Sequence, residues 1–233
     1  MDGNFIGKYR GLNTAKGTVG YAVDMVFCID GTWSHQESLN RIREIIPNIL
    51  EDVAIGSQNQ GRNLAQLRSR FIVFRDYIAD GKNAMQVTDF FLLPQQEKDF
   101  LECLHSIEAD GGGDPAEDGL EALAFAIKSS WTTASPKRRH VIVLFTDEEA
   151  HPLGYGRNSR YYPKGMPRNL AELAAWWDNM GDAKRLILCT PDTQYWRSIS
   201  DSWDMAFHVL ESAELFSMDS LLAEIVRQLL WEL

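Results

Sequence analysis

Three short segments of the chain carry side chains with hard oxygen donors. In Asp30-Gly31-Thr32-Trp33-Ser34, a carboxylate and two hydroxyls occupy alternate positions. A second segment, 111–118, is rich in glycine and contains Asp114 and Glu117, and Asp147 closely follows the apolar run HVIVLF. Oxygen donors of this mixture suit Mg²⁺ or Mn²⁺, and Mg²⁺ requires an octahedron of ligands at roughly 2.1 Å. Water fills the positions that protein groups leave, so the coordination shell can accept an outside ligand.

Each segment also has an ordinary structural explanation. Asp30 and Ser34 could cap the helix that follows them, 111–113 could be a plain loop, and Asp147 could be a turn residue. However, Asp30, Glu117 and Asp147 would stand on one rim, where carboxylates repel one another without a cation. The combination therefore favours a metal site.

Secondary structure that positions these segments is predicted from the apolar pattern. Apolar runs of strand length suit strands that are buried on both faces. The expected strands are 22–29, 70–77, 87–92, 140–145, 185–189 and 205–210. The expected helices are 37–53, 94–107, 119–130, 168–180, 193–200 and 218–233. Pro47 falls inside the first helix and is expected to kink or break it.

Strands that alternate with helices predict an α/β fold, with a doubly wound, mostly parallel sheet and helices on both faces. The short turn Gly81-Lys82-Asn83 makes the strands at 70–77 and 87–92 antiparallel at one edge of the sheet. Ligands of such sheets lie beyond the carboxyl ends of the strands, which is where the oxygen-rich segments fall. We expect one domain over residues 21–233, preceded by an extension at 1–20.

The overall composition limits the classes of partner. The net charge of −10 argues against binding to nucleic acid or to an anionic membrane surface, and an acidic surplus usually serves solubility. Cys28, Cys103 and Cys189 are scattered and odd in number, so we expect no disulfide framework and a reducing, cytoplasmic location. No apolar run approaches the ~20 residues that span a bilayer.

Other chemistries fit the sequence less well. A Mg²⁺-dependent phosphohydrolase is the main alternative, because Ile29-Asp30-Gly31-Thr32 is similar to the Asp-x-Asp-Gly-Thr loop of haloacid-dehalogenase phosphatases. In that loop, the nucleophile is an Asp carboxylate. Cys28 occupies its position here, so the carboxylate that would form the covalent intermediate is missing. No Gly-Lys-Ser/Thr follows 111–113 to hold phosphates, and the Cys and His residues lack the spacing of zinc ligands. We therefore do not expect an enzyme.

The oxygen-rich motifs, taken in chain order, resemble the von Willebrand factor A domain family. Asp30-Gly31-Thr32-Trp33-Ser34 matches the Asp-x-Ser/Thr-x-Ser signature of its metal-ion-dependent adhesion site. The run 111–118 is similar to the Gly-Gly-Gly-Asp-x-Pro-Glu loop of bacterial and kinase-associated members, and its Asp…Glu spacing resembles that of integrin β subunits. Phe145-Thr146-Asp147 is similar to the end of the family's fourth strand, and Phe74-Arg75-Asp76-Tyr77 to the end of the second.

The resemblance implies a Rossmann-like fold and the ligands of one Mg²⁺, with Mn²⁺ or Ca²⁺ as substitutes. Many relatives supply a Thr from the middle loop. No Thr or Ser occurs between 111 and 118, so Glu117 takes this role, with Asp114 as its substitute. The metal ligands that the resemblance implies, direct or through water, are Asp30, Thr32, Ser34, Glu117 and Asp147.

The resemblance also implies a function. The chain is expected to be a protein-interaction module of bacterial cytoplasmic type, whose cation accepts an Asp or Glu side chain of a partner protein. Relatives of this type serve beside AAA+ ATPases or with kinase and phosphatase partners. Exposed aromatic residues and Arg are typical interface anchors. The expected partner-binding residues are Trp33, His151, Tyr155 and Arg157, with Arg160, Tyr161 and Tyr162 on the same loop. An ordinary loop whose Tyr residues pack onto the domain is the alternative.

Two apolar features of the second half of the chain have no assigned chemistry. Its tryptophans are expected to fill the core under the late helices, with a partner groove as the alternative. The run 221–233 is apolar on more than one face, which indicates burial or self-association.

Overall fold

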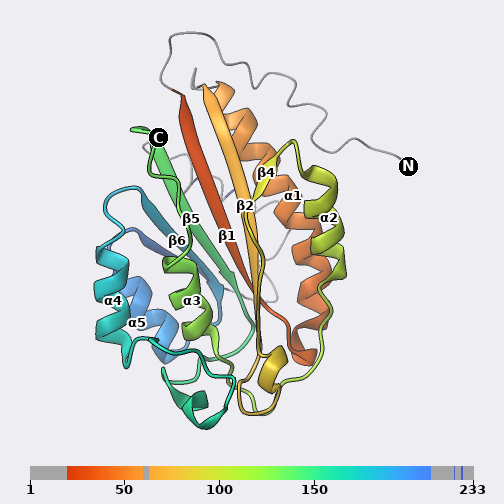
Figure 1. The fold of residues 1–233 in the computed structure, drawn as a ribbon, viewed down its shortest axis with the longest axis vertical. Coiled ribbons are helices and arrows are strands. Elements are labelled where there is room, and N and C mark those ends of the chain that lie inside the picture. Colours follow the sequence, from red (N-terminus) through yellow and green to blue (C-terminus); the bar gives the residue numbers. More distant parts are fainter. Residues whose placement is uncertain (1–19, 60–62, 211–222, 224–226, 228–233) are drawn as a thin grey trace.

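A computed structural model describes residues 20–59, 63–210, 223 and 227 of the chain. This part of the chain forms a sheet of seven strands in the order β3-β2-β1-β5-β6-β7, and β4 also pairs with β2 (Figure 1). The strands are β1 (Tyr21–Asp30), β2 (Leu64–Phe74), β3 (Met85–Val87), β4 (Phe91–Leu93), β5 (Arg138–Phe145), β6 (Lys184–Thr190) and β7 (Ala206–Leu210). The pairs that join β2, β1, β5, β6 and β7 are parallel, whereas β3 and β4 pair with β2 in the antiparallel direction.

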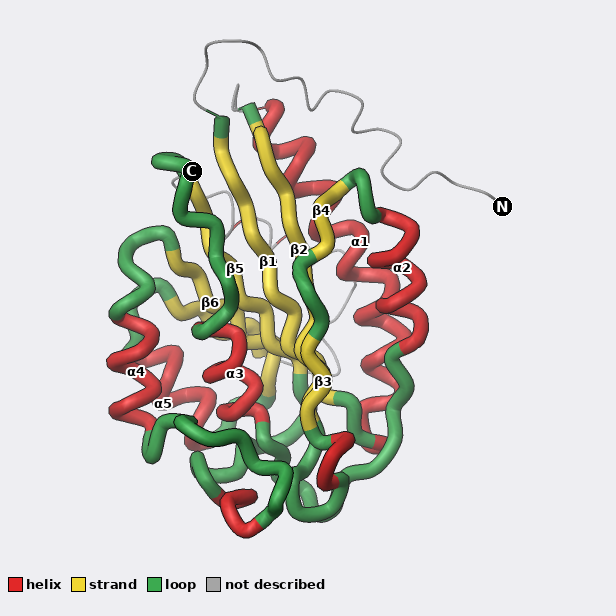
Figure 2. The backbone as a smooth tube through the Cα atoms, viewed as in Figure 1, coloured by secondary structure: helices red, strands yellow, loops and turns green. Residues whose placement is uncertain are grey.

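Helices cover both faces of the sheet, as Figures 1 and 2 show. The helices are α1 (Gln36–Asn59), α2 (Glu97–Ser106), α3 (Gly119–Ile127), α4 (Leu170–Asp178) and α5 (Gln194–Ser202). One face of the sheet packs with α1 and α2, and the other packs with α3, α4 and α5. The predicted α/β fold with a mostly parallel sheet and an antiparallel edge is therefore confirmed.

The central strand β1 explains why its sequence is an unbroken apolar run. Met25 and Phe27 belong to the core under α1, and Val26 and Cys28 belong to the core under α3. Because alternate side chains of a strand point to opposite faces, a strand that is covered on both sides must be apolar at every position.

The predicted break of the first helix at Pro47 is wrong, because α1 continues as one helix from Gln36 to Asn59. A proline inside a helix costs about 3 kcal/mol. On both sides of Pro47, the side chains of Ile45, Ile46, Ile49 and Leu50 are at most 3% exposed. Packing of this apolar stripe against the sheet outweighs the local preference of the proline.

The strands at the antiparallel edge differ from the sequence-based expectation. The strand expected over 70–77 begins earlier, at Leu64, and ends at Phe74. The single strand expected over 87–92 is two short strands, β3 and β4. Between them, the Thr88 hydroxyl accepts a hydrogen bond from the Phe71 amide at 3.0 Å, so a side chain replaces a backbone partner and the ladder is interrupted.

The cysteines, the tryptophans and the two ends of the chain were also the subject of predictions. Cys28 and Cys189 are buried, as predicted, and Trp177, Trp196 and Trp203 lie in the core under α4 and α5. The extension at 1–20 and the helix at 218–233 lie outside the described residues, apart from positions 20, 223 and 227. Within the described residues, no helix has the length and apolar character to cross a membrane.

One buried carboxylate ties the amino-terminal ends of the central strands to the segment after α3. Asp24 on β1 is fully buried and accepts hydrogen bonds from Arg68 Nε at 2.8 Å and from Arg68 Nη2 at 2.7 Å. The Thr132 amide donates to Asp24 Oδ2 at 2.6 Å. Although burial raises the pKa of Asp24, the hydrogen bonds from Arg68 and Thr132 keep it below its ordinary value.

We expect Asp24→Asn to lower the free energy of unfolding at pH 7 by about 3 kcal/mol, because it leaves Arg68 without its charge partner. The lowered pKa means that Asp24 stabilises the wild type above its ordinary pKa of 3.8 and that this contribution fades as the pH falls below that value. Urea denaturation at neutral and at acidic pH measures both effects, and the variant should lose less stability on acidification. The exposed Asp99→Asn is the control, and equal effects of the two substitutions would contradict the prediction.

Candidate metal centre

The three oxygen-rich segments meet at the carboxyl edge of the parallel strands. β1 ends at Asp30, β2 ends at Phe74 and β5 ends at Phe145, and the loops that follow these strands form the lower end of the molecule in Figure 1. The segment before α3 reaches the same edge, because the Trp33 amide donates to the Gly111 carbonyl at 3.3 Å. This is the position at which doubly wound sheets bind their ligands.

The first loop arranges its three oxygen-bearing side chains around Asp30, which is fully buried. Asp30 Oδ1 accepts hydrogen bonds from the Thr32 amide at 2.9 Å and from the Thr32 hydroxyl at 2.6 Å. The Thr32 and Ser34 hydroxyls are 3.1 Å apart. On the other side, the Thr146 hydroxyl donates to Asp30 Oδ2 at 2.6 Å. Asp30, Thr32 and Ser34 therefore form one cluster, and Thr146 connects it to the end of β5.

Glu117 approaches this cluster from the glycine-rich loop. Its side chain is only 3% exposed, and a Cβ at Gly112 would lie 3.2 Å from Glu117 Oε1 and 3.3 Å from the Thr32 Cβ. Gly112 has a φ of +91°, a left-handed conformation that favours glycine. A side chain at this position would strain the backbone and crowd both Glu117 and the first loop.

Two of the carboxylates have bare, buried oxygens. Within the described residues, Glu117 Oε2 and Asp147 Oδ1 are buried without a hydrogen-bond partner. Burial, followed by the charges of Asp30, Asp76 and other nearby carboxylates, raises the pKa of Glu117 to about 9. Burial and the charge of Asp30 raise the pKa of Asp147, although His35 opposes this shift.

The donor set fits a hard divalent cation. A buried carboxylate oxygen without a partner costs about 1–3 kcal/mol or more, and like charges on neighbouring carboxylates add to this cost. A divalent cation beside Asp30 would offset the charges of the carboxylates around it. Carboxylates and hydroxyls are the oxygen ligands that Mg²⁺, Mn²⁺ and Ca²⁺ prefer.

Sequence reasoning missed the role of Arg75, which holds the loops of the site together. The guanidinium is buried, and its Nε donates to the carbonyls of Gly31 at 2.8 Å and Asp110 at 2.7 Å. Its Nη2 donates to the carbonyl of Glu108 at 2.7 Å. Arg75 thereby joins the first loop to the segment before the glycine-rich loop. The sequence signal for this residue is the Phe-Arg-Asp-Tyr motif at the end of the second strand.

A second group of possible ligands, Asp76, Asp114 and His151, lies beside the first, with ligand atoms within 4.8 Å of one another. His151 Nε2 is 2.9 Å from Asp114 Oδ1, and the Tyr155 hydroxyl donates to Asp114 Oδ2 at 3.2 Å. Asp118 Oδ1 is 3.3 Å from His151 Nδ1. Asp114 is thus engaged by His151 and Tyr155, so Glu117 is the better candidate for the Asp30 cluster. The contribution of Asp76 to this group was not foreseen.

The predicted partner-binding residues divide into exposed and buried ones. Trp33 is 69% exposed, and Tyr155, Arg157, Arg160 and Tyr161 are also exposed. His151 is only 4% exposed, with its ring stacked on that of Tyr155 at 3.9 Å between centroids. His151 can therefore act on a docking surface only by positioning Tyr155 and Asp114. Tyr162 is partly buried and packs against Tyr77.

The fold and the site together define a doubly wound α/β domain with a candidate cation site at the carboxyl edge of its sheet. The family model of the von Willebrand factor type A domain matches residues 24–164, which is more than half of the chain. The chain therefore belongs to the von Willebrand factor type A domain family.

Solved structures agree with this assignment at the level of the fold. The pilus adhesin SpaC from Lactobacillus rhamnosus GG is 13% identical over 91% of this chain and 30% of the adhesin, with a TM-score of 0.55 in its open conformation; a second form has a TM-score of 0.58 at nearly the same coverage. Proximal thread matrix protein 1 from the mussel byssus, with a zinc-occupied MIDAS motif, is 12% identical over 91% of this chain and 47% of that protein, with a TM-score of 0.52. The chain thus spans less than half of either protein. A search of curated proteins finds no match.

The substitution Glu117→Gln tests two effects of this carboxylate separately: its cost to the stability of the metal-free protein and its contribution to Mg²⁺ binding. In metal-free buffer, the raised pKa of Glu117 makes the wild type less stable as the pH rises from 4.5 towards 9, because the unfolded chain releases this proton first. We expect the variant to be more stable than the wild type at pH 8 by about 1–3 kcal/mol, because Glu117 must take up a proton when the wild type folds at this pH, whereas Gln is neutral in both states. Mg²⁺ should raise the melting temperature of the wild type much more than that of the variant.

The matched control for this experiment is Glu121→Gln, which alters a second buried glutamate, on the helix α3 that follows Glu117. Glu121 also has a raised pKa, about 7, so its substitution also relieves a buried charge. The response of this control to Mg²⁺ should equal that of the wild type. A Glu117→Gln variant that keeps the full response would remove Glu117 from the ligand set.

Proposed function

We propose that this domain binds a protein partner through a divalent cation, Mg²⁺ in the first instance, and that the cation accepts an Asp or Glu side chain of the partner. Asp30, Thr32, Ser34, Glu117 and Asp147 would hold the cation, directly or through water. The observation that carries the proposal is that carboxylates from three separate segments share one buried rim, where two of their oxygens have no partner in the described part of the chain.

The surroundings of the cluster support a docking role. When bound, the cation would supply a positive charge and a coordination position for an outside carboxylate. Trp33 lies between the two hydroxyl residues of the first loop and is exposed, so an incoming segment would meet it first. The membership of the chain in the von Willebrand factor type A family supports the same reading, because metal-dependent interaction is the common role of the family.

An enzymatic role has less support. The phosphohydrolase alternative requires a nucleophile at Cys28, but this side chain is fully buried between the sheet and α3. Burial raises the pKa of the Cys28 thiol far above its ordinary value, so the reactive thiolate is not formed. The proposal is therefore a binding module without catalysis.

The nature of the partner and its location are parts of the proposal. A partner that belongs to an AAA+ ATPase or a kinase and phosphatase system follows from the resemblance to bacterial relatives. Cys28, Cys103 and Cys189 form no disulfide, which supports a reducing compartment, with the cytoplasm as the expected one. The net charge of −10 gives no support to a nucleic-acid partner.

The direct test combines calorimetry with partner capture. We expect Mg²⁺ and Mn²⁺ to bind the wild type and not Asp30→Ala, because this substitution removes the carboxylate at the centre of the cluster. Capture of a partner should require the cation, and both chelator and Asp30→Ala should abolish it. Capture that is unaffected by either change would refute the proposal. Turnover of a phosphate ester that depends on Asp30 would favour the enzyme instead.

Trp33→Ala tests the docking surface without touching the ligands. The Trp33 side chain is exposed, and exposed aromatic anchors contribute about 1–2 kcal/mol or more when a partner buries them. We expect partner affinity to fall about tenfold or more, while calorimetry shows an unchanged affinity for Mg²⁺. Leu92→Ala, an exposed apolar residue on β4, is the control. A loss of Mg²⁺ binding in Trp33→Ala would show that the residue shapes the metal site instead.

A further inference from the structure

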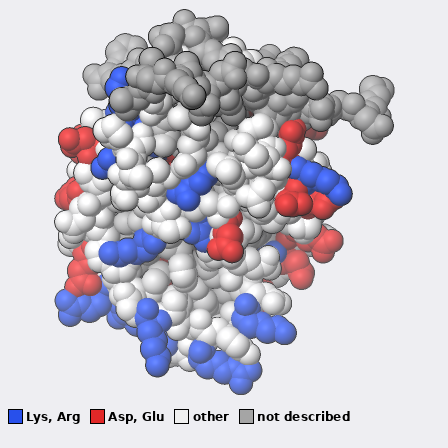
Figure 3. Space-filling model, turned by 45° about the horizontal axis from the view of Figure 1, so that its top comes forward, with Lys and Arg blue, Asp and Glu red and all other residues white. Residues whose placement is uncertain are grey.

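The loop between β5 and α4 is basic, although the chain as a whole is acidic. Between residues 151 and 168 there are four Lys or Arg residues and no Asp or Glu, whereas the net charge of the chain is −10. All four cations are exposed. Figure 3 shows several Lys and Arg side chains along the lower edge of the molecule. The four cations of the loop are Arg157, Arg160, Lys164 and Arg168.

Three of these cations line one surface pocket. The pocket has a volume of about 340 Å³ and is lined by Arg157, Lys164 and Arg168, together with Tyr162 and Gly165 among others. No carboxylate of the described residues lines it. Gly165 has a φ of +80° and nothing within 4 Å of the place of a Cβ, so one side of the pocket is open to a ligand.

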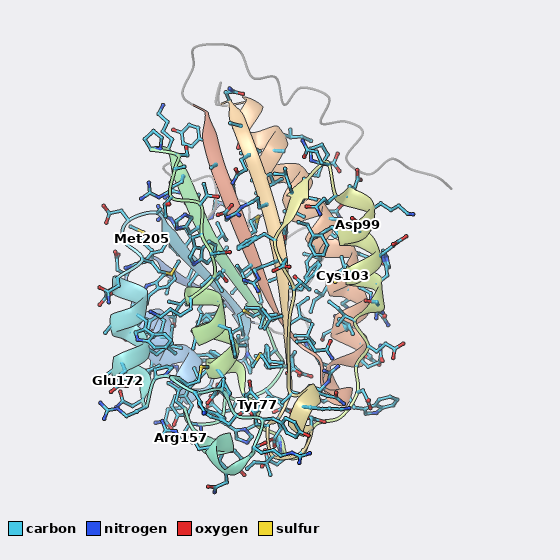
Figure 4. All side chains as sticks on the ribbon, in the orientation of Figure 1. Tyr77, Asp99, Cys103, Arg157, Glu172 and Met205 are labelled. Carbon is cyan, nitrogen blue, oxygen red and sulfur yellow. The ribbon has the colours of Figure 1, made fainter. Side chains whose placement is uncertain are left out.

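The cations of the pocket differ in how far they are already neutralised. Arg168 donates from its Nε to Glu172 Oε1 at 2.6 Å, so part of its charge is compensated. Arg157 Nη2 makes a single long contact with the Pro167 carbonyl, at 3.5 Å. No described carboxylate forms an ion pair with Arg157 or Lys164. Figure 4 shows Arg157 on the loop below α3 and α4, at the same end of the molecule as Tyr77.

Buried contacts fix this pocket relative to the candidate metal centre. The Tyr162 hydroxyl donates to Glu121 Oε1 at 2.7 Å, and the Gly154 amide donates to the same oxygen at 2.8 Å. Glu121 is fully buried on α3, which begins at Gly119, two residues after Glu117. The Tyr162 ring packs edge-on against Tyr77, with 5.2 Å between centroids. The wall of the pocket is thus attached to α3, and Glu117 of the metal centre lies in the segment that leads into this helix.

We propose that this pocket binds a second anionic group of the partner segment whose first carboxylate reaches the cation. The ligand is a carboxylate or a phosphate on an acidic protein segment. A guanidinium matches both groups with paired N–H donors, and a nearby ammonium adds a point charge. The part of the inference that concerns the partner rests on the proposed function, whereas the affinity of the pocket for anions does not depend on a cation.

The first experiment tests the pocket alone, with inorganic phosphate and acetate as probes. The full chain is freed of metal by dialysis, because a chelator left in solution is itself an anion that could occupy the pocket. Titrations followed by NMR should show saturable shifts of the Arg157, Lys164 and Gly165 amides. Arg157→Gln/Lys164→Gln should weaken probe binding about tenfold. Tighter binding of phosphate than of acetate would indicate a phosphorylated segment, and equal binding would indicate Asp or Glu.

The control Lys98→Gln/Lys137→Gln removes the same amount of charge from exposed positions outside the pocket. This variant should bind both probes as the wild type does. Equal weakening in the two double variants would show a general effect of charge and would overturn the inference. Absence of saturable shifts in the wild type would overturn it as well.

The second experiment separates this inference from the proposed function. In the presence of Mg²⁺, Arg157→Gln/Lys164→Gln should lower partner affinity about tenfold and leave Mg²⁺ binding unchanged. Asp30→Ala should abolish Mg²⁺ binding and leave phosphate binding unchanged. If Asp30→Ala still binds Mg²⁺, the proposed function fails and the anion pocket stands. If instead Arg157→Gln/Lys164→Gln binds the partner as the wild type does, the anion pocket fails and the proposed function stands.

Discussion

Burial of like charges at one edge of the sheet is the constraint on which the rest of this structure depends. Asp30, Glu117 and Asp147 come from three different segments, yet the fold brings them to one rim, with Asp30 and Glu117 almost completely buried. No folded protein places such carboxylates together without a counter-charge or a proton. In the absence of a cation, the raised pKa of Glu117, about 9, is the sign of this conflict. A cation at this rim, as proposed above, would remove the conflict.

The neighbouring acids show how a carboxylate is satisfied without metal, which makes the contrast informative. Asp76 accepts hydrogen bonds from two backbone amides of the loop that follows it, and Asp80 accepts one from the Gly112 amide. Asp118 accepts one from the Tyr77 amide at 2.6 Å. These carboxylates shape the loops, whereas Glu117 and Asp147 keep buried oxygens without such partners in the described part of the chain. Because Glu121 Oε2 is also buried without a partner among the described residues, an unsatisfied oxygen marks a candidate ligand only where it lies at the carboxyl edge of the sheet near Asp30.

The local sequence pattern was sufficient to predict elements whose side chains have a single role. It was insufficient where contacts between distant parts of the chain determine the structure. The unbroken apolar run of β1 and the alternating donors after it predicted both a buried strand and an oxygen cluster. The first half of β2 was missed because Arg68 is polar on a buried strand, and only its pairing with Asp24 on β1 explains this. Thr146 was quoted as part of a motif, but its hydrogen bond to Asp30 spans 116 positions of the chain. No local pattern encodes such a contact.

The distribution of charge gives the metal site and the basic loop a common purpose. A chain with a net charge of −10 repels an acidic partner at long range, and the bare rim adds three carboxylates at the point of contact. A divalent cation reverses the sign of the field at the rim, and Arg157 and Lys164 extend the positive region along the adjacent loop. In the proposed complex, the cation and the loop would act on the same acidic segment, the cation by coordination and the loop by attraction. Acidic ligands that reach only one of the two would be held weakly, which is how this edge of the sheet could discriminate among the many acidic surfaces of a cell.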